Sequence, residues 1–302
     1  MGKSKFFNFR RNLTLHFMLL PGLVILLVYS YGPMAGLVMA FQKFRPARGF
    51  FRSEWVGLEN FKTLFNYPQI PQVISNTLYI AIFKIILGLI IPVTFALMLN
   101  EVKNIRYSKA MQTVVYLPHF LSWVILGGIF INILSPSNGI VNQFLGVLGI
   151  SPKYFLGDNS LFPGTLIWTD VWKEFGYGSI VYIAALAGID PALYEAASID
   201  GAGKIRQTIS VTLPGIAAII VVMGVLSLGN VLNAGFDQVF NLYSPQVYES
   251  GDILDTFVYR LGLKDAQYSL ATAVGMFKSV ISLVLISVSY VLAYKLADYR
   301  VF

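Results

Sequence analysis

The sequence predicts an all-α polytopic membrane protein with six transmembrane helices, and two observations carry this prediction. The chain of 302 residues is 56% hydrophobic and only 12% charged, with a mean hydropathy of +0.67. A soluble globular protein carries about twice that charged fraction. The second observation is a series of apolar runs, each roughly 20 residues or longer and therefore able to cross a hydrocarbon core of about 30 Å as a helix. Such runs are too long for the strands of a closed barrel.

The composition also excludes several classes of function. The chain has no cysteine and only two histidines, His16 and His119, so it offers neither a thiolate nor a histidine cluster for a metal. Lys204 follows Gly203, but a phosphate-binding loop would need a glycine at Ser198. We therefore expect no metal, no cofactor and no enzymatic activity in this chain, and any ATP and Mg²⁺ must bind to a partner. The net charge of +7 is attributed to basic cytoplasmic flanks rather than to nucleic-acid binding.

The apolar runs divide the chain into a short leading segment, residues 1–12, and one six-span domain, residues 13–302. The first run is too long for a signal-peptide core, so it is expected to be a span with residues 1–12 in the cytoplasm. The expected spans cover residues 13–41, 73–99, 110–134, 163–188, 214–235 and 271–296.

The distribution of Lys and Arg predicts the orientation. With the N-terminus inside, the cytoplasmic segments carry more bases than acids, whereas the outer segments are balanced. The first outer segment weakens this bias because it is itself basic, with Lys43, Arg45, Arg48, Arg52 and Lys62. This orientation leaves both termini and residues 190–214 in the cytoplasm.

Residues 190–214, DPALYEAASIDGAGKIRQTISVTLP, form a polar island between two apolar runs. Asp190 is a good N-cap and Pro191 suits the first helical position, so a short helix is expected over Pro191–Ile199. Gly201 and Gly203 permit a tight turn. A second short helix is expected over Lys204–Val211, and Pro214 is expected to begin the fifth span.

This island resembles the signature loop of the permease subunits of bacterial ABC importers. The matching residues are Glu195, Ala196, Ala197, Gly201, Leu213 and Pro214, with Val211 where isoleucine is usual. The resemblance implies a type I importer permease fold, in which this loop docks on a separate cytoplasmic ATPase. We assign the coupling role to the matching positions and the adjacent acid: Glu195, Ala196, Ala197, Asp200, Gly201, Leu213 and Pro214. The alternative is an ordinary connecting loop.

A second stretch, FDQVFNLYSPQVYESGDILDTFVYR at residues 236–260, resembles the polysaccharide and complex-oligosaccharide permeases of the maltose-permease-like superfamily. That resemblance implies alternating access in the bacterial plasma membrane. It implies as partners a second, different permease subunit, an ATPase dimer and an extracytoplasmic solute-binding protein that delivers an oligosaccharide. The stretch GLENFKTLF, residues 57–65, also resembles these permeases, and it is interpreted equally as an interfacial anchor or as a contact for the binding protein.

Ionisable residues within spans commonly line a polar path. Asp170, Lys173 and Glu174 of the fourth span share one helical face, on which Lys173 can pair with either acid. We interpret them as a sugar path, together with Trp172, Asn230, Asn233 and Lys278. Structural ion pairs, snorkelling lysines and helix–helix hydrogen bonds are the alternatives.

Two other functions remain open. A secondary transporter or channel without an ATPase explains the spans and the buried charges, but it leaves residues 190–214 unexplained, and the chain lacks two similar three-span halves. The other is an ABC permease for a non-sugar solute.

Overall fold

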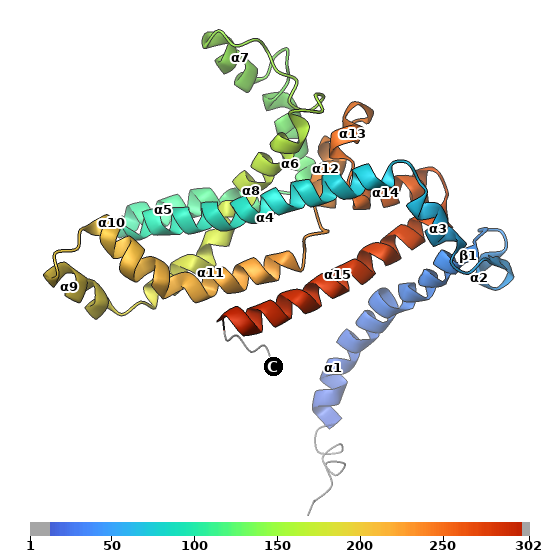
Figure 1. Cartoon of the computed structure of the whole chain (residues 1–302), viewed down its shortest axis with the longest axis horizontal. Helices are drawn as coiled ribbons and strands as arrows, with labels where there is room; N and C mark the ends of the chain where they lie inside the picture. The colour runs from blue at the N-terminus through green and yellow to red at the C-terminus, as the bar shows by residue number, and fades with distance from the viewer. Residues whose placement is uncertain (1–12, 298–302) are drawn as a thin grey trace, which may run out of the picture. The chain divides into compact units, whose positions relative to one another are not determined.

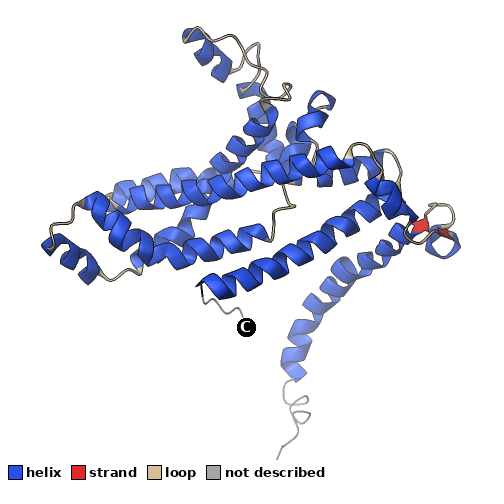
Figure 2. Ribbon diagram, viewed as in Figure 1, coloured by secondary structure: helices blue, strands red, loops and turns tan. Residues whose placement is uncertain are grey.

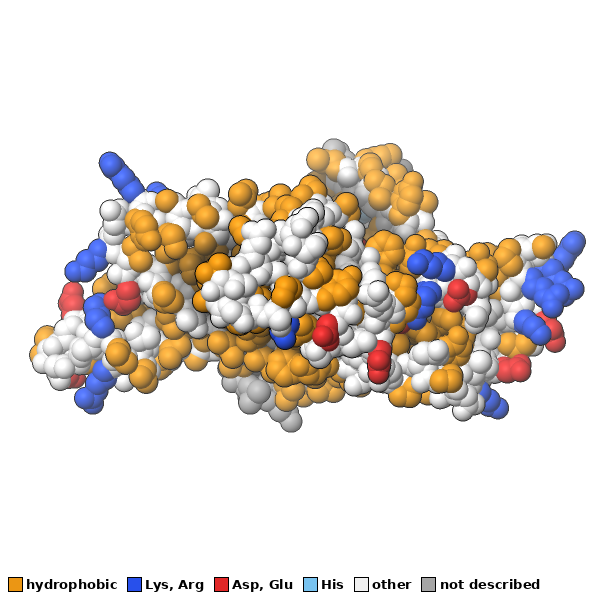
Figure 3. Space-filling model, turned by 90° about the horizontal axis from the view of Figure 1, so that it is seen from above, with side chains coloured by type: hydrophobic (Ala, Val, Ile, Leu, Met, Phe, Trp, Pro, Cys, Tyr) orange, Lys and Arg blue, Asp and Glu red, His pale blue; other side chains and the backbone are white. Residues whose placement is uncertain are grey.

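A computed structural model describes residues 13–297, and this part of the chain is mainly helical (Figure 2). The expected cytoplasmic segment 1–12 and the last residues, 298–302, lie outside the described residues. Within the described residues, four helices are long and apolar enough to cross a membrane: Leu15–Phe41, Ile70–Asn100, Lys204–Leu228 and Tyr268–Leu292. Two bent pairs, Ile105–Phe120 with Trp123–Ile133 and Phe162–Ala187 with Pro191–Ile199, bring the total to six if each pair is one span. Hydrophobic side chains cover a large part of the surface in Figure 3, and the all-α membrane fold is confirmed.

The described chain forms two units, the first of which combines residues 13–66 with Leu261–Met276. Its long helix runs without a break through α1 (Leu13–Leu26), η2 (Leu27–Tyr31) and η3 (Gly32–Phe41). A small antiparallel hairpin follows, in which β1 (Gln42–Lys43) pairs with β2 (Glu54–Trp55) around α2 (Gly49–Arg52). α3 (Glu59–Phe65) comes next, and the unit also contains most of η7 (Arg260–Lys264) and the start of α15 (Tyr268–Ala297).

The second unit combines Tyr67–Arg260 with residues 277–297. Its helices are α4 (Ile70–Asn100), α5 (Ile105–Tyr116), η4 (Leu117–Phe120), α6 (Trp123–Ile133), α7 (Ile140–Val147), α8 (Phe162–Ala187), α9 (Pro191–Ile199), α10 (Lys204–Gln207), η5 (Thr208–Thr212), α11 (Leu213–Leu228), α12 (Phe236–Leu242), η6 (Pro245–Val247), α13 (Tyr248–Gly251) and α14 (Leu254–Tyr259).

The core of this unit lies where α4, α8 and α11 meet. α4 packs along α8, and α11 packs against both (Figure 1). Ala96 of α4 and Ile216 of α11 are completely buried, beside Tyr182 of α8. In a membrane, where lipid is as apolar as these side chains, such close packing holds helices together.

The third expected span, residues 110–134, is not one helix, so that prediction is wrong in detail. The chain bends by 101° between Ile105–Phe120 and Trp123–Ile133. Pro118 has no N–H to continue the helical ladder, and Leu121 is extended. Ser122 then caps the new helix, because its Oγ accepts a hydrogen bond from Ile125 N at 3.4 Å.

The fifth span also differs from its prediction at both ends. The helix begins at Lys204 and continues through Pro214. In an α-helix the proline ring would clash with the carbonyl four residues earlier, but that carbonyl lies in the wider π-helical turn Thr208–Thr212. It ends at Leu228, so Asn230 and Asn233 lie in the turn after the helix and not within a span.

Candidate functional site

Residues 190–214, here called the elbow, fold as a helix and a turn at the end of α8, with α9 and α10 side by side (Figure 1). Asp190 Oδ1 accepts a hydrogen bond from Ala192 N at 2.9 Å, which caps α9. The expected helix Pro191–Ile199 is confirmed residue for residue, and it bends by 69° from α8. Gly201 has φ of +79°, a conformation that costs other residues energy. The elbow therefore has a defined turn.

The inner side of the elbow is braced by a buried glutamine that sequence reasoning missed. Gln207 is 8% exposed, and its Nε2 donates to Ser198 Oγ at 2.9 Å and to Ala202 O at 3.0 Å. Tyr194 OH lies 3.1 Å from Thr212 Oγ1, which joins α9 to the base of α11. These contacts favour motion of the elbow as one body.

The outer side of the elbow is exposed to solvent. The side chains of Leu193, Ile199 and Ile205 are 53%, 87% and 78% exposed, and Glu195 and Ala196 are exposed beside them. A cavity of about 640 Å³ separates α9 and α10 from the loop that follows α4. Lys204 spans this cavity with an ion pair to Glu101 at 3.1 Å. The surface combines apolar side chains with a fixed charge.

The seven residues assigned to the elbow do not form a single surface. Asp200 and Gly201 are exposed near Glu195, and Ala197 is half-buried. Leu213 instead packs against the core where α4, α8 and α11 meet, and Pro214 follows it into α11. Leu213 therefore joins the elbow to the core, while Glu195 and Ala196 are exposed on its surface.

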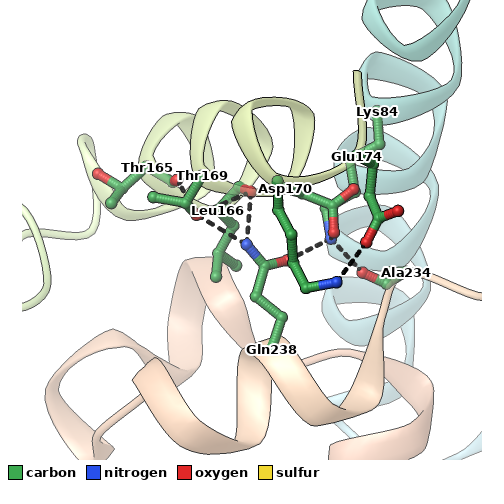
Figure 4. A network of polar contacts seen from close by, with 9 residues as sticks. Lys84, Thr165, Leu166, Thr169, Asp170, Glu174, Ala234 and Gln238 are labelled. Atoms are coloured by element: carbon green, nitrogen blue, oxygen red, sulfur yellow. Dashed lines mark hydrogen bonds and ion pairs between the residues drawn. The ribbon is translucent and has the colours of Figure 1, made fainter. Parts of the chain in front are cut away.

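A second candidate site is a polar pocket between α4, α8 and the turn after α11. Lys84 Nζ lies 3.3 Å from Asp170 Oδ1, donates to Ala234 O at 2.7 Å and also donates to Gln238 Oε1 (Figure 4). The cavity beside this lysine has a volume of about 260 Å³, and its lining includes Asp170, Asn230 and Asn233. Three of the residues predicted to form the path therefore converge on one pocket.

Gln238 fixes one wall of this pocket, and the sequence did not reveal it. The side chain is fully buried, and Nε2 donates to Leu166 O at 2.7 Å and to Thr169 Oγ1 at 2.8 Å (Figure 4). Since Oε1 accepts from Lys84, the amide connects α4, α8 and α12. Its partners are far away in sequence, so no local spacing could have identified it.

The other predicted path residues lie in a different cluster. Lys173 Nζ pairs with Glu174 at 2.6 Å and donates to His119 O at 2.9 Å, so Lys173 satisfies a carbonyl at the break between α5 and α6. His119 Nδ1 lies 2.6 Å from Glu174 Oε2, and its ring stacks on Tyr177 at 3.8 Å. The three charges of α8 thus separate into two groups, because Asp170 pairs with Lys84.

The last two predicted path residues, Trp172 and Lys278, do not line the polar pocket, and Lys278 does not pair with an acid of α8. Trp172 is 46% exposed and meets the edge of Phe130 at 5.6 Å between ring centres. Lys278 pairs with Asp255 at 2.5 Å. The indole of Trp172 is therefore partly exposed, whereas the charge of Lys278 is already compensated.

Comparison with known proteins identifies the class of transporter. The polygalacturonan/rhamnogalacturonan transport system permease protein YteP of Bacillus subtilis (strain 168) is 39% identical over 284 residues, which are 94% of this chain and 88% of YteP. The chain belongs to the permease subunits of bacterial ABC importers. No protein-family model matches it.

Solved structures agree with this assignment of the permease. The permease resembles a chain of a bacterial ABC transporter involved in the import of the acidic polysaccharide alginate. The TM-score is 0.88 and the identity is 40%, and the match covers 96% of this chain and 98% of the other. It also resembles a chain of a bacterial alginate ABC transporter in complex with an alginate pentasaccharide-bound periplasmic protein. The TM-score is 0.90 and the identity is 39%, and the match covers 99% of this chain and 100% of the other. The permease is therefore an integral membrane protein of the polysaccharide branch of type I importers. A secondary transporter or channel is not favoured.

Proposed function

We propose that the permease imports oligosaccharides delivered by an extracytoplasmic binding protein, and that a separate ATPase drives it through the elbow. The cargo is supported by the polysaccharides in the names of its relatives, polygalacturonan, rhamnogalacturonan and alginate. The binding protein is supported by the alginate transporter complex with its periplasmic protein. ATP and Mg²⁺ would bind in an ATPase dimer, with no enzymatic step in this chain, because it lacks a phosphate-binding loop.

The observation that carries the coupling role is that the elbow is braced internally and yet carries exposed side chains. Gln207 and Tyr194 hold it by hydrogen bonds, while Glu195 and Ile199, which line the same cavity, are exposed to solvent. A rigid element with an exposed apolar and charged face suits docking in a groove of a partner. Force applied at Glu195 would then pass into α8 and α11 rather than dissipate in the loop.

The polar pocket is the proposed part of the sugar path. Asn230 and Asn233 are exposed and can donate to sugar hydroxyls, and Asp170 can accept from them. At about 260 Å³ the pocket is smaller than typical ligand sites, which begin near roughly 300 Å³. An oligosaccharide would need the helices around the pocket to separate, as alternating access requires.

The proposed assembly contains a second, different permease subunit. The proposed orientation places the N- and C-termini and the elbow in the cytoplasm, in agreement with the distribution of Lys and Arg. This orientation is what makes the elbow accessible to an ATPase.

The test is copurification of the candidate ATPase from cells that also express the second permease. We expect wild type to retain the ATPase and Glu195→Arg to lose it, because the charge at the docking face is reversed. Glu249→Arg is a matched control, since Glu249 is also an exposed acid but lies outside the elbow. Equal retention by all three proteins would refute docking at the elbow. ATP-dependent uptake of neutral and acidic oligosaccharides in proteoliposomes would then define the cargo.

A further inference from the structure

A second surface of the chain has an unusual composition, and it lies in the hairpin formed by residues 42–55, here called the basic hairpin. Its tip has one defined shape. Arg48 N donates to Arg45 O at 2.8 Å, and Arg45 N donates to Ser53 Oγ at 3.1 Å. The buried Gln42 donates from Nε2 to Phe50 O at 2.9 Å, which closes the tip over the strand pair.

This hairpin presents three arginines and several aromatic rings to solvent. Arg45, Arg48 and Arg52 are exposed, Phe50 and Trp55 are partly exposed, and Phe51 is 102% exposed. The one acid of the hairpin, Glu54, lies opposite Lys43 in the strand pair. Among the side chains that the structure describes, no carboxylate lies within ion-pair distance of the three guanidinium groups. The three positive charges repel one another, and the exposed ring of Phe51 is unfavourable in water. The tip therefore suits an anionic and partly apolar partner.

The hairpin also follows directly after the end of a transmembrane span. The span Leu15–Phe41 ends one residue before Gln42. Asn60 Nδ2 donates to Ala40 O at 2.8 Å and to Gln42 O at 3.0 Å, which ties α3 to this junction. Phe41 stacks on Trp55 with ring centres 5.7 Å apart. A short hairpin that is fastened to the end of a span in this way is held at the depth of the lipid headgroups.

We propose that the basic hairpin docks on anionic phospholipid headgroups, with its arginines on the phosphates and Phe51 inserted at the interface. Guanidinium groups match phosphate oxygens in charge and in geometry. An aromatic ring beside them gains by leaving water for the acyl boundary. Lipid fits better than an acidic soluble partner, because the hairpin is fastened to the span and Phe51 is completely unpacked. The inference does not depend on the proposed function, and it holds for either orientation of the chain.

The chain contains no cysteine, so a single reporter can be placed at the tip. Ala47 is exposed there, and Ala47→Cys can carry an environment-sensitive fluorophore. The labelled full-length permease would be placed in two matched series of nanodiscs, which contain increasing mole fractions of nitroxide-labelled phosphatidylglycerol or of nitroxide-labelled phosphatidylcholine. Each basic residue near an anionic surface strengthens binding roughly fivefold. We therefore expect half-quenching at a mole fraction of phosphatidylglycerol at least about fivefold below that of phosphatidylcholine.

The triple variant R45Q/R48Q/R52Q should lose this preference and R45K/R48K/R52K should largely keep it. The matched control is K103Q/R106Q/K109Q, which removes the same charge from three exposed bases elsewhere and should behave as wild type. If the glutamine variant fails to fold, wild type still tests the proposal, because salt should weaken an electrostatic preference. Equal quenching by both lipids would overturn the proposal. Protection of the fluorophore by the binding protein without lipid quenching would overturn it in favour of a protein contact.

Discussion

Replacing Gln207 by leucine should uncouple ATP hydrolysis from transport while leaving ATPase binding intact. The buried amide makes two hydrogen bonds, to Ser198 Oγ at 2.9 Å and to Ala202 O at 3.0 Å. At about 0.5–1.5 kcal/mol each, their loss removes roughly 1–3 kcal/mol from the brace. That energy corresponds to about a 5- to 150-fold change in the equilibrium constant between the braced and the unbraced elbow. The docking face around Glu195 is unchanged, so the ATPase should still bind.

The assay measures sugar transported and ATP hydrolysed in the same proteoliposomes. We expect the ratio of sugar to ATP to fall by roughly fivefold or more in Gln207→Leu. Gln143→Leu is the matched control, because Gln143 also donates one amide hydrogen bond to a loop carbonyl but is exposed and lies in α7. An unchanged ratio in Gln207→Leu, with normal ATPase retention, would refute the brace as the coupling element.

Three further predictions concern the elbow turn and the polar pocket. Gly201→Val should reduce coupling and lower the free energy of unfolding by about 1–2 kcal/mol, because φ at this position is +79°. Gly203→Val is the control, since Gly203 has equally open space but a φ of −69°, and it should behave as wild type in uptake and thermal unfolding. Lys84→Met should destabilise the permease by about 3–5 kcal/mol in detergent unfolding, because it leaves Asp170 without its buried partner. Lys204→Met breaks an exposed ion pair and should cost about 0–1 kcal/mol. Equal costs would show that the buried pair does not stabilise the pocket. Asp170→Asn breaks the same ion pair, so uptake is measured per assembled complex. It should fall, and unchanged uptake per complex would remove Asp170 from the path.

The parts of the elbow that the sequence predicted are those with local causes. Asp190 and Pro191 specify the start of α9 within two adjacent positions, and Gly201 specifies its end. No distant contact is needed for these signals, so the bounds of α9 were predicted without error, whereas the second expected helix, Lys204–Val211, continues into α11. Gln207 was missed because its partner Ser198 is brought close only by the turn between them.

The errors in the transmembrane region have a different origin. Hydropathy reports that a segment is apolar and not whether it is straight, so the break at Leu121 was invisible within the run 110–134. The same limitation extended the fifth span past Leu228 and placed Asn230 inside it. The pairing of Lys84 with Asp170 was missed because the two residues lie on different helices, and only packing decides which acid a buried lysine meets.

The two candidate sites share the same pair of helices, which gives coupling a direct physical route. α8 carries Asp170 at the pocket and continues for 17 residues, about 26 Å, to Ala187 beside the elbow. The other helix, Lys204–Leu228, rises from the elbow for about 37 Å and ends just before Asn230. Because Tyr194 and Gln207 hold α9 to the base of that helix, a push on the elbow reaches both helices. Passage of a sugar also requires the pocket between α8 and the turn at Asn230 to open. We therefore expect an engineered disulfide between α8 and this turn to block transport while leaving ATPase docking unchanged.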